Sequence, residues 1–150
     1  RLYKELIQTK RIAETVSTYA GSPGARFSNL FMVYATPRHP HTLCDIEKAV
    51  NDEINKIKNI PVSDQEMQRV KNQLKADFIR SLATNSGIAG SLSYYEALLG
   101  DYRYISRYNK VIEKITTADV LRVAGMYLNN SNRTVVRLTK TAAVQGSKTK

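Results

Sequence analysis

Residues 14–36 read ETVSTYAGSPGARFSNLFMVYAT and contain two runs that are rich in β-branched and aromatic residues. The first run spans residues 14–20, the turn-forming sequence SPG follows at residues 22–24, and the second run spans residues 25–36. Two such runs on either side of proline and glycine are typical of paired antiparallel strands. The stretch therefore predicts a β-hairpin near the start of the chain.

Helical spacing of apolar residues dominates the rest of the chain. Thr42 with Asp45 and Thr116 with Asp119 are start signals of the capping-box type, and Ser63 begins a similar start. After each start, apolar residues recur every three or four positions, which is typical of an amphipathic helix. Helices are therefore predicted at residues 1–8, 42–60, 63–82, 85–100, 101–115 and 116–128.

A closing strand is predicted at residues 133–140, RTVVRLTK, because Val135, Val136 and Leu138 make this segment apolar and β-branched. Two early strands and one late strand, separated by a long helical block, should pair in one sheet with the helices on one face. The predicted fold class is α+β, with a mostly antiparallel sheet packed against a block of helices.

The extent of the domain follows from the same pattern. The helix at residues 1–8 has no capping residue before it, so we expect the chain to be a fragment of a domain. The N-terminal part of that domain, with a further strand or two, is expected to be missing. Residues 1–140 are expected to form the folded part, and residues 141–150 a polar, basic tail.

The composition limits the class of protein. Of 150 residues, 42% are hydrophobic, which excludes a disordered chain, and no apolar run approaches the roughly 20 residues that cross a bilayer. The single cysteine cannot form an internal disulfide. The formal net charge of +10 favours acidic partners such as nucleic acid. However, the basic residues are spread along the helices beside carboxylates, a distribution that favours solvated helix faces.

One stretch, HPHTLC at residues 39–44, holds both histidines and the only cysteine. A zinc site needs three or four ligands that converge from a rigid frame. Pro40 interrupts the segment between His39 and His41, and Cys44 is expected in the first turn of a helix, facing the core like a small apolar residue. The stretch therefore predicts a surface loop and a helix start, without a metal site.

Other catalytic patterns do not occur in the sequence. It contains no CxxC, HExxH, HxxEH or Gly-x-Ser-x-Gly, and GSPG at residues 21–24 lacks the spacing and the lysine of a phosphate-binding loop. Carboxylates such as Asp45, Glu47, Asp52 and Glu53 lie among lysines on a predicted helix, where i,i+4 pairing is the simpler interpretation. The residues alone predict an α+β domain without catalytic or metal-ligating residues of its own.

Several stretches, in order, resemble the C-terminal-type domain of pitrilysin/insulinase-like zinc peptidases. Residues 1–20, RLYKELIQTKRIAETVSTYA, resemble its start, and VSDQEMQRVKNQL at residues 62–74 is the most specific match. NSGIAGSLSYYEALLGDYRY at residues 85–104 and ITTADVLRVAGMYLNNSNRTVVRL at residues 115–138 follow in the same order. The resemblance covers roughly residues 1–140.

The resemblance implies a fold like that of the metalloenzyme LuxS and mitochondrial processing peptidase, within a clamshell of two related halves. In this family one half carries zinc on HxxEH and a distal glutamate, for Lewis-acid and general-base hydrolysis of peptides. The other half has no metal and closes over an unfolded peptide, which is held partly by strand addition to a sheet edge. Because this chain lacks HxxEH, it resembles the metal-free half. It is then expected to hold no cofactor itself, and zinc is implied in its partner.

The resemblance also bears on the site residues. In many family members the metal-free half offers an arginine and a tyrosine, seven residues apart, that polarise the scissile carbonyl. Ile7 and Glu14 stand at those positions in this sequence, and Arg11 and Tyr19 are near but at a different spacing. No catalytic residue is therefore carried over, and Arg11 and Tyr19 are expected only to line the substrate chamber.

The function expected from the resemblance is that of a non-catalytic domain of a zinc metallopeptidase. It would enclose a peptide and pair with a zinc-bearing half, in the same chain or in a homo- or hetero-dimer. Three alternatives stay open: an inactive structural subunit of the same fold, a basic nucleic-acid-binding domain, and an independently active enzyme. The sequence does not fix the compartment, and the bacterial style of the resemblance points to periplasm or cytoplasm.

Overall fold

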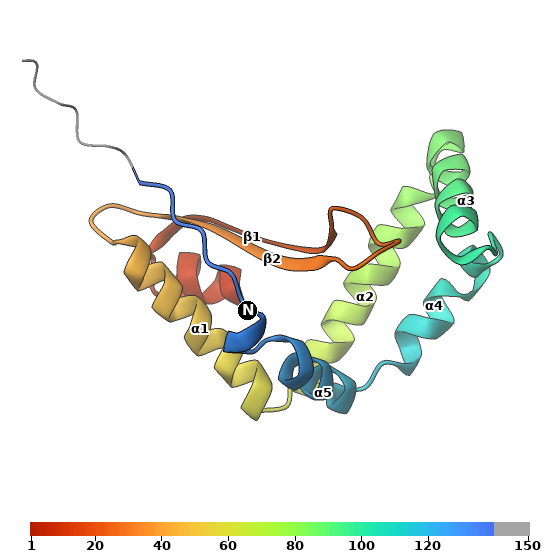
Figure 1. Cartoon of the computed structure of the whole chain (residues 1–150). Coiled ribbons are helices and arrows are strands. Elements are labelled where there is room, and N and C mark those ends of the chain that lie inside the picture. Colours follow the sequence, from red (N-terminus) through yellow and green to blue (C-terminus); the bar gives the residue numbers. More distant parts are fainter. Residues whose placement is uncertain (140–150) are drawn as a thin grey trace, which may run out of the picture.

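The computed structural model describes residues 1–139, which form an α+β fold, as predicted (Figure 1). α1 and the base of the hairpin lie at one end of the molecule, and the hairpin extends from there toward the middle of the view, while three successive helices, α2 to α4, form an arm (Figure 1). The elements in chain order are η1 (Lys4–Thr9), β1 (Ala13–Ser22), β2 (Leu30–Pro37), α1 (Leu43–Asn59), α2 (Asp64–Ser81), α3 (Asn85–Leu99), α4 (Tyr104–Lys114), α5 (Thr117–Tyr127) and η2 (Asn130–Asn132).

The hairpin predicted at residues 14–36 is confirmed as an antiparallel pair of strands. β1 pairs with β2 so that Val16 lies opposite Ala35 and Tyr19 lies opposite Met32. Side chains alternate between the two faces of a strand. Val16 and Ala35 therefore lie on one face of the sheet, and Tyr19 and Met32 lie on the other.

The predicted helix starts are confirmed by their capping hydrogen bonds. At the start of α1, the Thr42 hydroxyl accepts from the backbone N–H of Asp45 at 3.3 Å, and the Asp45 carboxylate accepts from the backbone N–H of Thr42 at 2.8 Å. Thr116 and Asp119 form the same reciprocal pair at the start of α5. Ser63 caps α2 with its hydroxyl. These contacts satisfy backbone donors that a helix leaves free in its first turn.

The chain before β1 is helical, as predicted, but its regular part, η1, is a π-helix. Leu6 in this helix is fully buried, and its carbonyl accepts from the backbone N–H of Ile12 at 2.9 Å. Arg11 has a φ of 55°, a left-handed conformation that is uncommon for a residue other than glycine. The chain reverses at Arg11, and Ile12 and Ala13 directly after it are both buried.

The buried core lies between η1, α1 and one face of the hairpin. Its members are Leu6, Ile12, Ala13, Ile46 and Ala49. Val16 and Ala35 pack against this cluster from the sheet, so their face is the inner face of the hairpin. Helices α2 and α3 contain no buried residue. The core therefore holds η1, α1 and the hairpin together. Helices α2 and α3 of the arm are held by weaker contacts.

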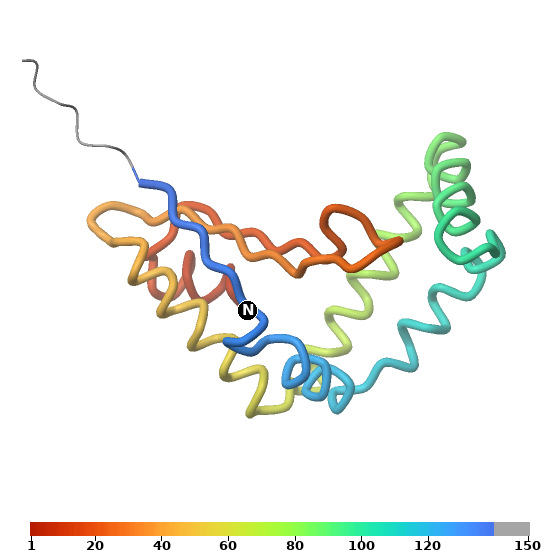
Figure 2. Tube along the Cα trace, viewed as in Figure 1, coloured from red at the N-terminus to blue at the C-terminus, as the bar shows by residue number. Residues whose placement is uncertain are grey.

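The closing strand predicted at residues 133–140 is wrong for residues 133–139, which have no regular secondary structure; Lys140 and the predicted tail at residues 141–150 lie outside the described residues. The segment instead runs beside α1 (Figure 2). Arg133 donates to the side-chain oxygen of Asn51 at 2.5 Å, and Arg137 forms an ion pair with Glu47. A strand needs a partner for its backbone hydrogen bonds, and among residues 1–139 only β1 and β2 pair.

Helices α2 and α4 contact each other through one aromatic pair and through two lysines of α2 that bind Glu113 of α4. The rings of Phe78 and Tyr108 stack with their centroids 4.3 Å apart. Lys71 Nζ donates to the backbone carbonyl of Glu113 at 2.7 Å, and Lys75 forms an ion pair with the Glu113 carboxylate. These contacts are exposed or half-exposed, so each contributes modestly to stability.

A charged contact links the start of the chain to the first turn of α2. Arg1 Nε and Nη2 donate to the two carboxylate oxygens of Glu66, each at 2.8 Å. These hydrogen bonds hold the pKa of the Glu66 carboxyl below its ordinary value. A carboxylate with a lowered pKa stabilises the fold above its unfolded-state pKa, and this stabilisation is lost as the pH falls through the folded-state pKa.

Replacing Glu66 with glutamine should therefore weaken the pH dependence of stability. We expect Glu66→Gln to lower the urea midpoint near neutral pH, and its difference from the native chain to shrink well below the ordinary glutamate pKa of about 4.3. Asp52→Asn is the control, since the exposed side chain of Asp52 makes no hydrogen bond or ion pair among the described residues. A difference of the same size at about pH 7 and about pH 3 would contradict the role of the Arg1 contact.

Candidate functional site

The face of the hairpin that points away from the core carries large exposed side chains. Tyr19 of β1 and Leu30, Met32 and Tyr34 of β2 share this face, because residues two apart in a strand point the same way. Tyr34 is 63% exposed, Leu30 60% and Tyr19 55%. We call these four residues the outer face of the hairpin.

The two residues expected to line a chamber lie on or near this surface, but not together. Tyr19 belongs to the outer face, whereas Arg11 precedes β1 and is exposed at its start. Six residues of strand alone span about 20 Å, so one small group cannot contact both side chains. Ile7 packs against the core, and Glu14 is exposed. The described chain thus places no arginine–tyrosine pair at positions 7 and 14.

Sequence reasoning found Tyr19 but missed Leu30, Met32 and Tyr34. The signal was present, since these three residues recur at every second position of the run at residues 25–36. The residues that alternate with them in the same run, Phe31, Val33 and Ala35, are also apolar. With apolar residues on both faces, the periodicity could not show which face is buried.

The stretch at residues 39–44 forms a loop and the start of α1. The backbone N–H of His41 donates to the carbonyl of Arg38 at 2.8 Å, which closes a turn. Cys44 lies in the first turn of α1 but is exposed, so the expectation that it faces the core is wrong. Ile46 and Ala49 occupy the buried side of α1 instead. Within residues 1–139, no group of His, Cys, Asp and Glu side chains could hold a metal ion.

Tyrosines of the arm surround a shallow cavity between α2 and α3. The cavity has a volume of about 290 Å³ and is lined by Phe78, Ser81, Gly87, Gly90, Ser91, Tyr94 and Tyr95. The rings of Tyr95 and Tyr104 approach to 5.0 Å between centroids. Burial, and secondarily the neighbouring tyrosines, raise the pKa of the Tyr95 hydroxyl. The lining residues offer serine and tyrosine hydroxyls but no carboxylate, imidazole, amine or thiol.

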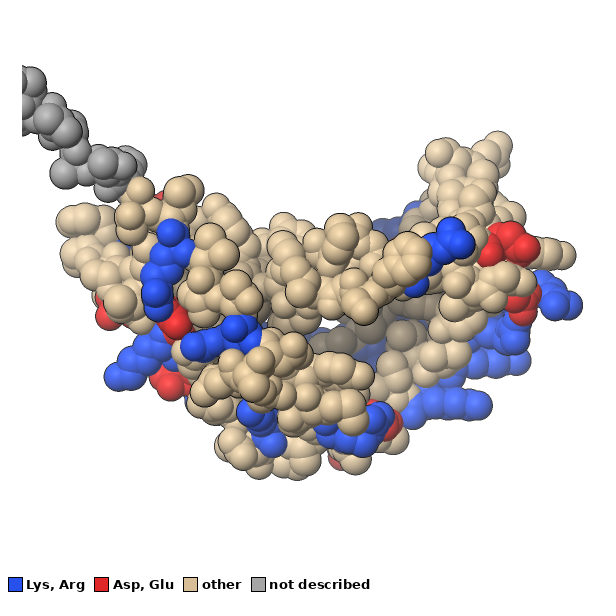
Figure 3. All heavy atoms as spheres, viewed as in Figure 1, with Lys and Arg blue, Asp and Glu red and all other residues tan. Residues whose placement is uncertain are grey.

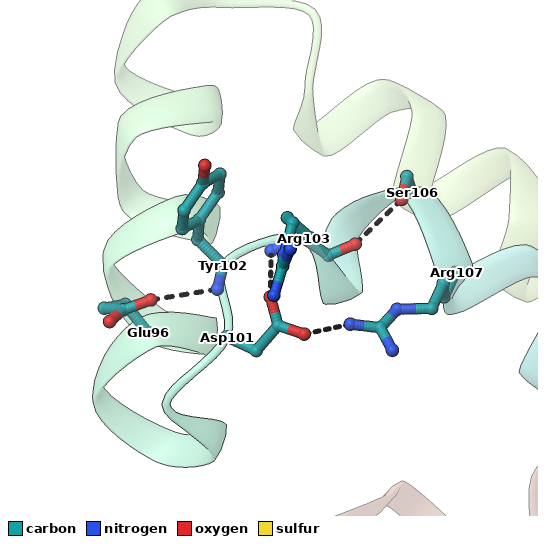
Figure 4. A network of polar contacts seen from close by, with 6 residues as sticks. All are labelled: Glu96, Asp101, Tyr102, Arg103, Ser106 and Arg107. Carbon is teal, nitrogen blue, oxygen red and sulfur yellow. Dashed lines mark hydrogen bonds and ion pairs between the residues drawn. The ribbon is translucent and has the colours of Figure 1, made fainter.

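A polar network fixes the turn between α3 and α4 (Figure 4). The Asp101 carboxylate accepts from the backbone N–H of Arg103 at 3.0 Å and from its Nε at 2.8 Å, and it also pairs with Arg107. The Arg103 side chain is the main cause of the lowered pKa of the Asp101 carboxyl. The Glu96 carboxylate accepts from the backbone N–H of Tyr102 at 3.0 Å. The network ties the end of α3 to the first turn of α4, and Asp101 pairs with two arginines, Arg103 before α4 and Arg107 within it.

Figure 3 shows acidic side chains beside basic ones over much of this face, and a larger number of basic side chains along its lower right edge. Many arginines and lysines of the described chain pair with carboxylates, such as Arg122 with Asp119 and Arg80 with Asp77. A nucleic-acid site usually needs a continuous basic patch or stripe. The distribution therefore does not single out a nucleic-acid interface. Among residues 1–139, no helix is both long enough and apolar enough to cross a membrane.

The fold and the surface together define a class: an α+β domain with an exposed sheet face and, in its described part, no set of metal ligands. Residues 1–74 match the family model of the peptidase M16 inactive domain. Just under half of the chain thus matches this inactive domain, and the predicted resemblance to the metal-free half of zinc peptidases is confirmed.

The relatives agree with this assignment. The zinc protease PqqE of Helicobacter pylori (strain ATCC 700392 / 26695) is 25% identical over 138 residues, which are 91% of this chain and 30% of that protein. A solved protease from Helicobacter pylori has a TM-score of 0.77 at 23% identity, over 87% of this chain and 31% of that one. This chain therefore spans less than a third of the length of these two relatives.

A solved structure of single-domain size gives the same fold. The inactive peptidase domain of a "putative zinc protease" from Bordetella parapertussis has a TM-score of 0.76 at 22% identity. The alignment covers 97% of this chain and 77% of that one. At this identity the likeness shows the fold alone. What the whole protein does is therefore a separate question.

Proposed function

We propose that this chain serves as the metal-free half of a zinc metallopeptidase, where it encloses an unfolded peptide and pairs with a zinc-bearing half. The match of residues 1–74 to the peptidase M16 inactive domain carries the proposal. The described residues offer no group of ligands that fits a zinc ion, and the zinc is proposed to lie in the partner half, where it would supply Lewis-acid chemistry. This chain would form part of the wall that encloses the peptide, and Arg11 and Tyr19 are proposed to line the chamber.

The exposed surface supports pairing with a large partner. The accessible surface is 11716 Å², whereas a compact monomer of 16.9 kDa should expose about 7,700 Å². Complete exposure of the eleven residues outside the described part would account for only about 1,600 Å². The remaining excess, about 2,400 Å², lies at the upper end of the roughly 1,000–2,500 Å² that an obligate interface buries on each partner.

A reconstitution assay tests the proposal. The chain is co-expressed with the zinc-bearing half encoded in the same or the neighbouring reading frame, and a fluorogenic peptide of about ten residues reports hydrolysis. We expect no hydrolysis by this chain alone and at least about tenfold more by the pair than by the zinc-bearing half alone. Hydrolysis by the zinc-bearing half that this chain leaves unchanged would contradict the proposal.

The same assay separates the alternatives. An inactive structural subunit predicts a stable complex without hydrolysis, and an independent enzyme predicts hydrolysis by this chain alone. A nucleic-acid-binding domain predicts tight oligonucleotide binding that falls steeply with salt. Only the proposed function predicts that zinc removal abolishes hydrolysis by the pair and leaves the isolated chain unchanged.

A further inference from the structure

Helix α4 carries four basic residues along one side. Arg103 is its N-cap, and Arg107, Lys110 and Lys114 follow at intervals of four, three and four residues. Residues three or four apart lie on the same side of a helix, so these side chains form one row about 16 Å long. All four residues are exposed, and Figure 3 shows basic side chains gathered at the lower right, where Figure 1 places α4. We call these four residues the basic row of α4.

The opposite side of α4 is the one that packs against the rest of the arm. Tyr108 stacks on Phe78 of α2, and the ring of Tyr104 lies beside that of Tyr95 in α3. Ile112 on the same side is buried. The packing of these apolar side chains turns the basic row away from the neighbouring helices, toward solvent.

The described chain balances only part of this positive charge. Asp101 pairs with the first two residues of the row, and Glu113 of α4 pairs with Lys75 of α2. Lys110 and Lys114 form no ion pair among residues 1–139. Like charges that lie three or four residues apart repel each other along a helix. A partner that brings negative charge to the row would remove this repulsion.

The carboxylates beside the row indicate the kind of partner. Asp101 lies before its first residue, and Glu113 lies beside its last. The phosphates of a nucleic acid or of an anionic membrane carry negative charge only, so both carboxylates would repel them. A protein surface holds charges of both signs at fixed positions and can place its carboxylates against the row alone. The pattern of charge on this chain therefore favours an acidic protein surface.

We propose that the basic row of α4 steers the pairing of this chain with the zinc-bearing half, by attraction to an acidic patch on that half. Lysine is depleted in the cores of protein interfaces, whereas charges at the rim raise the rate of association. The row therefore belongs to the rim of the interface. This inference rests on the proposed function, because it takes the zinc-bearing half as the partner. It adds the residues through which pairing begins and the charge of the surface that they meet.

The rate of association with the zinc-bearing half tests the inference. The zinc-bearing half of the reconstitution assay is immobilised, and binding of this chain is followed by interferometry between about 50 and 500 mM NaCl. We expect the association rate constant of the native chain to fall at least about tenfold over this range, because salt screens the attraction.

The double variant Lys110→Glu/Lys114→Glu should slow association at least about tenfold at the lowest salt concentration and less than about threefold at the highest. The control is Lys4→Glu/Lys48→Glu, which changes the net charge by the same amount. Lys4 of η1 and Lys48 of α1 are exposed and form no ion pair among the described residues. This control should leave the association rate within about threefold of native at every salt concentration. Far-UV circular dichroism should match the native spectrum for both variants.

Equal slowing by the two double variants would overturn the inference and leave the proposed function standing, because net charge and not the row would then set the rate. An association rate of the native chain that salt does not change would overturn it in the same way. Binding of a 20-nucleotide oligonucleotide that the Lys110/Lys114 variant loses, with its association rate unchanged, would also overturn it, because nucleic acid would then be the occupant. Failure of the proposed function appears separately, as a native chain that leaves hydrolysis by the zinc-bearing half unchanged at saturating concentration.

Discussion

Replacing Leu6 with alanine is expected to lower the free energy of unfolding by about 2–5 kcal/mol. Leu6 is fully buried, and among the described residues it is the one large side chain with no exposed surface. It packs with Ile12, Ile46 and Ala49, so its removal leaves a cavity where η1 meets α1. Because small domains are stable by about 5–15 kcal/mol, the variant should unfold at a much lower urea concentration.

Two further variants make this result interpretable. Leu6→Met conserves side-chain volume and should cost less than about 1.5 kcal/mol. Leu99→Ala removes a leucine that is 50% exposed at the end of α3, and should cost less than about 1 kcal/mol. Urea unfolding followed by circular dichroism compares the three. A loss for Leu6→Ala no greater than that for Leu99→Ala would show that η1 does not anchor the core.

The second large effect is expected at Gly87, in the first turn of α3. A Cβ atom at this position would overlap the backbone carbonyl of Ser81, the last residue of α2. Backbone cannot move aside as easily as a flexible side chain, so Gly87→Ala should destabilise the chain by about 1–3 kcal/mol. The close approach lets the chain turn from α2 into α3 within Leu82–Thr84.

Gly90 provides the matched control in the same helix. A Cβ atom there would meet nothing within 4 Å. Gly90→Ala should therefore stabilise α3 by about 0.5–1 kcal/mol, since alanine loses less backbone freedom than glycine in a helix. Thermal unfolding of both variants measures the contrast. Destabilisation by Gly90→Ala as large as that by Gly87→Ala would contradict the proposed contact with Ser81.

The sequence correctly predicted those helix starts and strand pairs that depend on interactions between residues close together in the chain. The capping pair of Thr42 with Asp45 closes within one turn, so four residues were enough to place the start of α1. The hairpin at residues 14–36 likewise needs only its own two runs and a turn. These elements formed where the sequence predicted them.

The predictions were wrong where contacts between residues far apart in the sequence determine the local structure. Residues 133–139 have the composition of a strand, but a strand exists only beside another strand, and Arg137 contacts Glu47 of α1 instead. The π-helix and the left-handed Arg11 depend on the fit of Leu6 and Ile12 to the core. Cys44 is exposed because the rotation of α1 is set by Ile46, which spacing alone did not resolve.

For the candidate site, the resemblance to a known family predicted the class of protein. The structure then showed which side chains form the exposed face of the hairpin. The sequence suggested Tyr19 because it lies near an expected position, without showing which face of the sheet it occupies. The pairing of Tyr19 with Met32 placed both on the outer face and added Leu30 and Tyr34. That assignment needed the position of the core, which residues far apart in the chain determine.

We propose that this domain encloses the substrate of a peptidase and has no metal centre of its own. Titration of Zn²⁺ into the metal-free chain tests this statement. We expect no stoichiometric zinc binding with a Kd below about 1 μM. Protein zinc sites, in contrast, bind the ion with a free energy of about 10 kcal/mol or more. The double variant His39→Ala/His41→Ala should give the same isotherm as the native chain. One tightly bound zinc per chain, lost in that variant, would contradict the account.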